Sequence, residues 1–422
     1  MKQFVMKGDI CYSIDATTLR TLEGGYLVCD DGHSAGVFEA LPDQYLTWPL
    51  LDFSGKMIVP GLVDLHMHAP QFTFRALGMD KELIDWLNEY TFPEEAHYRD
   101  MEYAQAAYEI VADELRRGPN TRTVLFATLH SEATERLMAL MEETGLVSYV
   151  GRVNMDRNGP PELCESSAEA SLSGTREWIE RTINQYRNTK PILTPRFIPT
   201  CTDALMRGLS ALQEAYGLPM QSHLSENQSE VEWVRELCPK SENYADAYYQ
   251  SGAMRGLPTI MAHCVWCDAN ELALLARSGT FVAHCPQSNI NIASGIAPIR
   301  RYLRHGLRVG LGSDVAGGAH LSIFRAMSDA IGVSKLRWRL VDAGDEPLTL
   351  AEAFYLGTLG GGAFFGKVGS FEAGYEFDAL VIDEGAMRSA VPLSMEDRLA
   401  RVVHLSDDRH IERKFVRGMR VL

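Results

Sequence analysis

The stretch Pro60-Gly61-Leu62-Val63-Asp64-Leu65-His66-Met67-His68 is an apolar run that ends on two histidines. Its composition predicts a β-strand, in which side chains two residues apart point to the same side. His66 and His68 are therefore placed to hold one metal ion together. Such a pair alone is weak evidence for a metal site, so the rest of the chain has to supply further ligands.

Seven more short runs rich in β-branched and apolar residues follow, with longer segments of helical spacing between them. The predicted strands are 62–67, 123–127, 147–153, 192–197, 219–223, 259–263, 280–284 and 307–312. The main predicted helices are 101–117, 132–143, 168–186, 204–216 and 271–277. Eight strands alternating with helices are typical of a closed parallel (β/α)8 barrel, for which about 250 residues suffice.

The two flanks of the chain have a different pattern, because they alternate polar and apolar residues and carry turn signals such as Asp30-Asp31-Gly32. Neither flank is long enough for a good sandwich alone. We therefore expect residues 1–58 and 369–422 to pair into one small composite β-sandwich domain, and residues 59–368 to form the barrel. The predicted fold class is α/β, with a TIM-like barrel and this second domain.

The composition restricts the partners of the chain, which has 422 residues and a formal net charge of −16. Nucleic acids and anionic membranes attract basic surfaces, so neither is an expected partner. No run approaches the ~18 apolar residues of a membrane span, and the first residues lack the apolar core of a signal peptide. Eight scattered cysteines do not resemble a disulfide framework. We expect a cytoplasmic protein with reduced thiols.

Metal-binding side chains end several of the predicted strands. In such barrels the chemistry takes place where the carboxyl ends of the strands meet. The histidines and the carboxylate found there are His66, His68, His223, His263, His284 and Asp314. A catalytic zinc or iron ion needs three or four such ligands and an open position for water. The sequence therefore predicts a metal site.

Seven motifs carry a resemblance to a known family. They are PGLVDLHMHAPQ (60–71), WLNEYTFPE (86–94), TPRF (194–197), SHLSENQSE (222–230), MAHC (261–264), AHCPQSN (283–289) and GLGSDVAGG (310–318). The barrel motifs resemble those of the amidohydrolase superfamily, and the loop motifs resemble its guanine deaminase branch. The resemblance implies a barrel with a composite β domain. It also implies hydrolysis of guanine to xanthine and ammonia by a metal-activated water, in purine catabolism or salvage.

The resemblance further implies a set of metal ligands. One divalent ion is bound by His66, His68, His223 and Asp314. His263 is then a long-range ligand or orients the water. Zinc is the expected ion and iron the alternative, because imidazole and carboxylate ligands suit both. Binuclear relatives carry a bridging lysine at the end of the fourth strand, whereas Lys190 lies at its start, so one ion is expected.

Catalysis requires proton transfer as well as a nucleophile. A bound metal lowers the pKa of water from ~15.7 toward ~7, and Asp314 beside it can accept the proton. Glu226 follows the strand that presents His223, and the family uses this glutamate to protonate the ring nitrogen. The predicted catalytic residues are Glu226, Asp314 and His263. Glu230 and Glu232, on the following helix, are interpreted as solvated acids.

Substrate recognition is expected from hydrogen bonds to the purine edge, since such a site rejects analogues that leave them unmade. The resemblance places Gln71 and Arg196 on the polar edge of guanine and Phe197 against the ring. Arg196 supplies donors that suit a carbonyl oxygen, so adenine is expected to be a poor substrate. The predicted substrate-binding residues are Gln71, Arg196, Phe197, His223 and Glu226. Relatives are often dimers, and a homodimer is expected here.

Two alternatives to guanine deamination stay open. One is a sister deaminase that acts on a pterin or an adenosine-type heterocycle. The other is a barrel scaffold without catalysis, against which the cluster of inward polar groups argues. His284 is expected to support the loop 286–289 by hydrogen bonding, and the loop 86–93 to form a lid or to pack on the barrel rim. The turn 117–123 departs from the family pattern, through a re-routed loop or an altered pocket floor.

Overall fold

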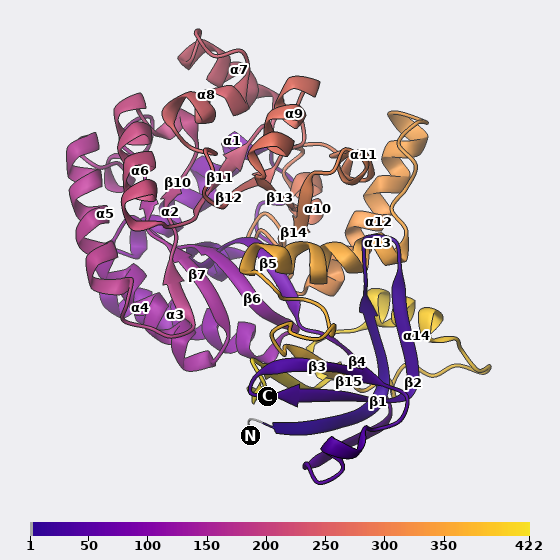
Figure 1. The fold of residues 1–422 in the computed structure, drawn as a ribbon. Helices are drawn as coiled ribbons and strands as arrows, with labels where there is room; N and C mark the ends of the chain where they lie inside the picture. Colours follow the sequence, from indigo (N-terminus) through magenta and orange to yellow (C-terminus); the bar gives the residue numbers. More distant parts are fainter. Residues whose placement is uncertain (1–2) are drawn as a thin grey trace.

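A computed structural model describes residues 3–422, so residues 1 and 2 of the predicted first flank lie outside the described range. Short strands surrounded by helices lie above a sheet in Figure 1. These strands are β5 (Leu62–His68), β6 (Asn120–Phe126), β7 (Val147–Gly151), β8 (Val153–Asn154), β9 (Thr189–Pro191), β10 (Thr194–Pro195), β11 (Met220–Leu224), β12 (Thr259–His263), β13 (Phe281–His284) and β14 (Arg308–Leu311). Each predicted strand overlaps one or two of them.

Hydrogen bonds close these strands into a ring. Parallel pairing joins β5, β6, β7 and β9 in one run and β11 to β14 in another. One gap is bridged where the Gln221 amide donates to the Leu193 carbonyl at 2.9 Å. The other is bridged behind β14, where the Asp314 amide donates to the His66 carbonyl at 2.9 Å. The predicted α/β barrel is confirmed.

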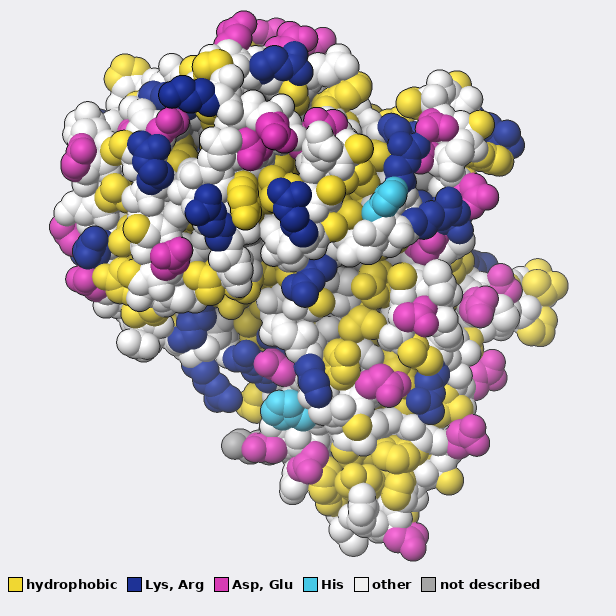
Figure 2. Space-filling model, turned by 45° about the horizontal axis from the view of Figure 1, so that its top comes forward, with side chains coloured by type: hydrophobic (Ala, Val, Ile, Leu, Met, Phe, Trp, Pro, Cys, Tyr) yellow, Lys and Arg dark blue, Asp and Glu magenta, His cyan; other side chains and the backbone are white. Residues whose placement is uncertain are grey.

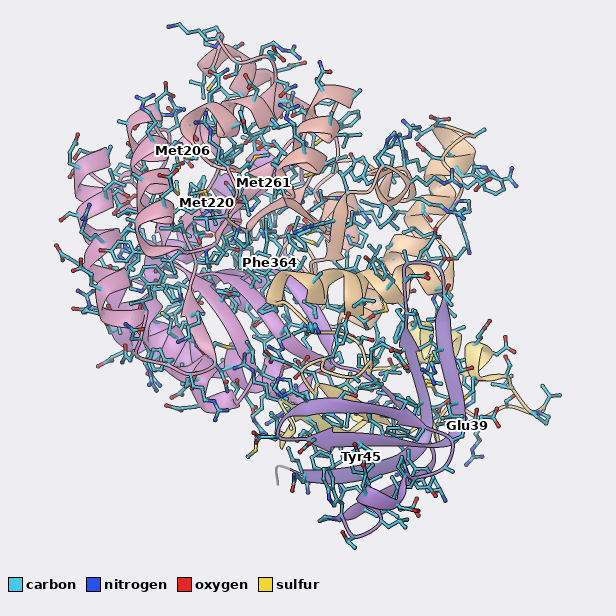
Figure 3. The ribbon with its side chains drawn as sticks, in the orientation of Figure 1. Glu39, Tyr45, Met206, Met220, Met261 and Phe364 are labelled. Carbon is cyan, nitrogen blue, oxygen red and sulfur yellow. The ribbon has the colours of Figure 1, made fainter. Side chains whose placement is uncertain are left out.

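Helices cover the outside of this ring. They are α3 (Met101–Arg117), α4 (Ser131–Thr144), α5 (Ala168–Thr182), α6 (Asp203–Tyr216), α7 (Gln228–Leu237), α8 (Tyr244–Ser251), α9 (Ala269–Ser278), α11 (Ile299–Arg304), α12 (Ile323–Leu340) and α13 (Leu350–Tyr355). Met220 and Met261 on the strands and Met206 on α6 belong to the same buried core (Figure 3). Burial of this apolar layer is the main term that holds the helices on the barrel.

The amino-terminal end of the barrel is filled with apolar side chains. Val63, Ile192 and Ile260 belong to this cluster, together with Phe364, which also packs edge-on against the Phe281 ring (Figure 3). Since this end is closed by packing, only the carboxyl ends of the strands can hold a polar site. The turn 117–123 lies at the closed end, away from those carboxyl ends.

The two flanks form one seven-stranded sheet in the order β17-β16-β15-β4-β1-β2-β3. The strands are β1 (Gln3–Ser13), β2 (Leu19–Asp30), β3 (His33–Phe38), β4 (Leu50–Pro60), β15 (Ala379–Ile382), β16 (Ile411–Val416) and β17 (Met419–Arg420). Antiparallel pairing of β4 with β15 joins the two ends of the chain. The predicted composite β unit is thus present, and its division at 58/59 and 368/369 stays a prediction.

This unit is one continuous sheet where the sequence pattern suggested a sandwich. The pairing of β1 with both neighbours shifts register between Lys7 and Ile10. Such irregularities bend a strand and increase its twist, which lets one sheet curve around its own core. That core contains Phe4, Phe377 and Phe415, whose rings are in mutual contact.

A buried ion pair joins the sheet of the flanks to the barrel. Arg122 of β6 is fully buried and donates from Nε and Nη2 to the two carboxylate oxygens of Asp378, at 2.5 and 2.9 Å. The same guanidinium donates to Glu376 at 2.8 Å. The turn before β6 therefore leads directly into a contact between the barrel and the sheet of the flanks.

Arg122→Leu is expected to lower the free energy of unfolding by roughly 3–5 kcal/mol, because it leaves the buried Asp378 carboxylate without its partner. The matched control is Arg181→Leu, which removes an exposed pair with Glu135 and is expected to cost at most about 1 kcal/mol. Guanidinium unfolding of both variants measures the difference. Equal losses would show that the Arg122 pair does not hold the two parts together.

Among residues 3–422, no helix is both long and apolar enough to cross a bilayer. On the face drawn in Figure 2, basic and acidic side chains are interspersed over the surface. Cys201, Cys264 and Cys285 are buried free thiols, in agreement with the prediction of reduced cysteines.

Candidate active site

The two histidines of the opening stretch reach the site through an irregular strand. Asp64 pairs with Thr123 and Met67 pairs with Leu125, so β5 advances by three residues where β6 advances by two. A bulge of this kind re-aims the side chains that follow it. Leu65 packs in the barrel interior, and His66 also faces inward, toward His68. Strict alternation would have sent one of these neighbours outward.

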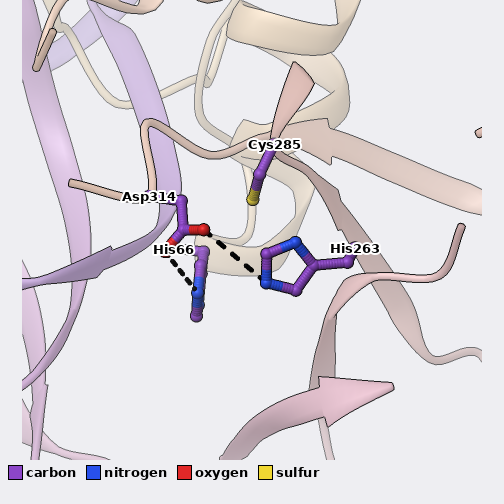
Figure 4. A group of neighbouring side chains, drawn as sticks. All are labelled: His66, His263, Cys285 and Asp314. Atoms are coloured by element: carbon purple, nitrogen blue, oxygen red, sulfur yellow. Dashed lines mark ion pairs between the residues drawn. The ribbon is translucent and has the colours of Figure 1, made fainter. Parts of the chain in front are cut away.

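The predicted metal ligands lie together at the carboxyl ends of the strands. Two groups have ligand atoms within 4.8 Å of one another: His66, His68 and His223, and His66, His263, Cys285 and Asp314. His68 Nε2 lies 3.1 Å from His223 Nε2. Asp314 Oδ1 lies 3.1 Å from His66 Nε2, and Asp314 Oδ2 lies 3.7 Å from His263 Nε2 (Figure 4). Cys285 was not predicted, because nothing in the sequence distinguishes it from the other seven cysteines.

The protonation of these groups suits a divalent metal ion. Burial lowers the pKa of His66, His68 and His223, so their imidazoles are neutral and offer lone pairs. Burial acts to raise the pKa of Asp314, but the facing histidines outweigh it and hold that pKa below its usual range. Among described residues, neither ring nitrogen of His66 has a well-directed hydrogen bond. Neutral imidazoles with one carboxylate form a donor set typical of zinc or iron.

Neighbouring groups fix the orientation of the rings. His223 Nδ1 lies 2.6 Å from the Arg196 carbonyl oxygen, to which an N–H there would donate, and His263 Nδ1 lies 2.9 Å from Asn289 Oδ1. Such partners leave Nε2 free to face a metal. His263 and Asp314 also have positive φ angles of 71° and 45°, a strained backbone that costs roughly 1–3 kcal/mol per residue. Backbone strain of this kind often occurs at functional sites, where the surrounding structure maintains it.

Glu226 lies beside this cluster. Its Oε2 is 3.4 Å from His263 Nε2, and the Ser294 hydroxyl donates to its Oε1 at 3.2 Å. Burial raises the pKa of Glu226 to about 7. The side chain is therefore a buried carboxyl group able to carry a proton near neutral pH.

The interpretation of Glu230 as a solvated acid was wrong. The residue is buried and accepts hydrogen bonds from the Glu226 amide at 2.9 Å and from the Tyr244 hydroxyl at 2.7 Å. It also completes the capping box of α7 with Asn227, which turns its side chain back toward the site. Glu232 is exposed, as predicted.

The expected support of a loop by His284 was also wrong. Both of its ring nitrogens lack a hydrogen-bond partner among residues 3–422, and burial lowers its pKa to about 3. The segment it was to support begins the helix α10 (Pro286–Asn291). The residue of this segment that does support the site is Asn289, through His263.

A polar wall faces the metal cluster. Gln71 comes from the short helix η2 (Ala69–Phe74), and Arg196 follows β10. Both bind Glu95, a buried residue of α2 (Phe92–His97) that sequence reasoning missed. Gln71 Nε2 donates to Glu95 Oε1 at 2.8 Å, and Arg196 Nη1 donates to Glu95 Oε2 at 2.6 Å. Nearby, Phe197 is largely buried.

A cavity separates this wall from the cluster. It is lined by His68, Gln71, Leu83, Trp86, Leu87, Arg196, Phe197, His223, Glu226, His263, Ile292 and Asp314. All predicted substrate-binding residues are among these. The segment 86–93 is helical, with α1 (Leu83–Trp86) and α2 joined by the wide turns of η3 (Leu87–Thr91). Trp86 and Leu87 of this segment, with Leu83 just before it, line the cavity, and the formation of a lid stays a prediction.

A larger hollow of about 740 Å³ lies between α9, α11 and α12. Its walls are mainly apolar, and its arginines, Arg301 and Arg337, already pair with Asp345. None of the lining residues belongs to the clustered histidines and carboxylates. The chemistry therefore belongs to the smaller cavity.

Comparison with known proteins agrees with this geometry. The family model described as "Amidohydrolase family" matches residues 57–421. A guanine deaminase of Dictyostelium discoideum is 36% identical over 88% of this chain and 84% of its own length. A guanine deaminase of Escherichia coli K12 is 33% identical over 97% of this chain and 95% of its own length.

The solved structures include a similar one. The crystal structure of guanine deaminase from C. acetobutylicum, with bound guanine in the active site, has a TM-score of 0.97 and 41% identity, and the match covers 100% of both chains. The match to the family model and the similarity to these relatives, together with the barrel and its inward histidines, show that this chain belongs to the amidohydrolase family.

Proposed function

We propose that this protein is a metal-dependent guanine deaminase that converts guanine and water to xanthine and ammonia. The observation that carries the proposal is a cavity with the histidine cluster and Glu226 on one side and the Gln71–Arg196 wall on the other. That wall offers directed donors to the carbonyl edge of a planar heterocycle. The full-length likeness to a guanine deaminase crystallised with guanine supports the same substrate.

The ligands of the metal are proposed to be His66, His68, His223 and Asp314, with His263 close behind. When bound, a divalent ion lowers the pKa of a coordinated water toward neutrality. Zinc is our choice of ion, with iron as the alternative. A single ion is favoured because Lys190 donates from Nζ to the carbonyls of Ile183 and Tyr186, near the end of α5 and remote from the cluster.

The residues then divide the proton transfers between them. The Asp314 carboxylate accepts the proton of the attacking water. Glu226 holds a proton on its carboxyl group and delivers it to the ring nitrogen next to the carbon under attack. Asp314 then passes its proton to the amino group, which leaves as ammonia, and the added hydroxyl returns a proton to Glu226 as it becomes the carbonyl of xanthine. His263, held by Asn289, faces both carboxyl groups and keeps the water oriented. Leu83, Trp86 and Leu87 exclude bulk water from the cavity.

A substrate panel tests the proposal. Ammonia release from guanine, adenine, adenosine and a set of pterins is measured with the purified, metal-loaded protein. We expect guanine to give a kcat/KM at least about 10²-fold above the others, because Arg196 suits a carbonyl and leaves an amino group unpaired. Preference for a pterin or an adenosine would replace guanine deamination by a sister activity, and inactivity on the whole panel would favour a scaffold.

Arg196→Ala is expected to lower kcat/KM for guanine by roughly 10- to 100-fold, the loss of a charged hydrogen bond of about 1.5–3 kcal/mol. Bound metal is expected to be unchanged, since the contact of Arg196 with His223 uses the backbone carbonyl, which alanine keeps. Kinetics and metal analysis of one preparation measure both. Loss of the metal with Arg196→Ala would show that the side chain supports the ligands.

The assembly and location are further proposals. A homodimer is supported by the exposed apolar side chains Leu336, Leu340 and Val341 at the end of α12, of which Leu340 is 78% exposed. Light scattering of the purified protein tests it, and a monomer at micromolar concentration would contradict it. A cytoplasmic location is supported by buried free thiols such as Cys285, which suit a reducing compartment.

A further inference from the structure

We propose that Glu95 is a positioning residue for the polar wall formed by Gln71 and Arg196. It makes this wall electrically neutral and fixes the pattern of its hydrogen-bond donors. The site therefore selects a neutral heterocycle that carries a carbonyl group over an anionic ligand. The inference rests on the proposed function, because it concerns the same cavity. It assigns a role to a residue that lies outside the barrel strands and does not line the cavity itself.

Glu95 is buried and joins two side chains that are far apart in the sequence. Its side chain is 4% exposed and that of Arg196 is 5% exposed. Arg196 donates from Nη1 to Oε2 at 2.6 Å and from Nη2 to Oε1 at 3.2 Å, a two-point contact. Gln71 donates from Nε2 to Oε1 at 2.8 Å. One carboxylate therefore sets the position of both predicted recognition side chains.

The contact with Glu95 decides which way the Gln71 amide points. The Ala316 amide N–H donates to Gln71 Oε1 at 3.3 Å, while the Glu95 carboxylate accepts from Nε2. If the Gln71 amide were turned by 180°, its Nε2 group would face the Ala316 N–H and its Oε1 would face the Glu95 carboxylate. Only one orientation satisfies both neighbours. Gln71 thus faces the cavity with a defined donor and a defined acceptor.

The same contact decides the charge of the wall. A guanidinium buried without a partner would be a strong site for an anion, such as a carboxylate or a phosphate. Glu95 supplies the opposite charge, and Phe92 of the same helix places its ring 5.2 Å from the guanidinium carbon of Arg196. The pair is neutral overall, yet Arg196 keeps N–H groups that Glu95 does not use. Those groups suit the carbonyl oxygen of a neutral purine.

Glu95→Gln is the direct test, because it removes the charge and keeps the shape. We expect KM for guanine to rise at least about tenfold with a smaller change in kcat, and the bound metal to stay unchanged. Purine-6-carboxylate, an anionic purine, is expected to bind at least about tenfold more tightly than it binds the unmodified protein. A purely structural role would lower stability and activity without this gain for an anion.

Two further variants sharpen the comparison. Glu94→Gln makes the same change one residue away, on a side chain that bonds Thr73 and does not line the cavity, and is expected to leave both affinities unchanged. Glu95→Asp keeps the charge and withdraws the oxygens, so guanine binding is expected to weaken with no gain for purine-6-carboxylate. This variant carries the test if Glu95→Gln does not fold.

The outcomes separate this inference from the proposed function. Calorimetric titration with purine-6-carboxylate requires no turnover, so the charge argument is tested even if guanine is not a substrate. Guanine turnover by the unmodified protein with no gain of anion affinity in Glu95→Gln would overturn the role of Glu95 alone. An unchanged KM for guanine in Glu95→Gln would overturn it as well.

Discussion

Glu226→Gln is expected to lower kcat for guanine by about 10²- to 10⁴-fold, the usual contribution of a positioned general acid. Bound metal and purine affinity are expected to stay close to those of the unmodified protein. The substitution conserves shape, and the Ser294 hydroxyl can still donate to an amide oxygen at the position of Oε1. Only the transferable proton is lost.

The measurement combines steady-state kinetics with metal analysis and a purine-binding titration. Glu232→Gln is the matched control, since it makes the same change on the exposed side of α7 and is expected to have no effect on kcat. Loss of metal from Glu226→Gln would show that Glu226 is a ligand, and full activity would remove it from the mechanism.

His66→Ala is expected to abolish metal binding and turnover together. His66 is fully buried and faces His68, His223 and Asp314 across the cluster. Removing a direct ligand should weaken metal affinity by more than the 10- to 100-fold typical of groups that only support ligands. The expected result is a folded protein with little bound metal after gel filtration and no detectable ammonia release.

His284→Ala is the control for that experiment, because His284 is equally buried at a strand end but lies outside both groups of clustered ligand atoms. Its metal content is expected to match that of the unmodified protein. Circular dichroism distinguishes loss of metal from loss of fold. A His66→Ala protein that keeps its metal would make His66 a core residue and remove the basis of the proposed site.

The sequence predicted the barrel because periodicity records which side of a segment is buried. Most of the barrel strands lie in short apolar runs, so eight runs could be found without knowledge of their neighbours, whereas β9, with the sequence Thr-Lys-Pro, was not predicted. The bulge in β5 could not be predicted in this way, since it depends on register with β6. The irregularity lies between Asp64 and Met67 and therefore includes His66, yet the rings of His66 and His68 still lie against each other.

Residues that act through distant partners were the ones that sequence reasoning missed. Glu95 follows the quoted WLNEYTFPE motif directly, but its partner Arg196 is 101 residues away. Glu230 has the spacing of an exposed helix position, and its burial depends on the capping geometry of α7. The candidate ligands, by contrast, carry their chemistry in their residue type and end the predicted strands, and the family resemblance selected the ligand set among them.

The most direct test of the central claim is the ultraviolet change of guanine to xanthine, with coupled ammonia detection, before and after chelation and zinc restoration. The account predicts conversion by the purified protein, its loss on chelation and its recovery with zinc. Conversion that persists in protein shown to be free of metal would contradict the role of the histidine cluster. No conversion by folded, metal-loaded protein would contradict guanine as the substrate.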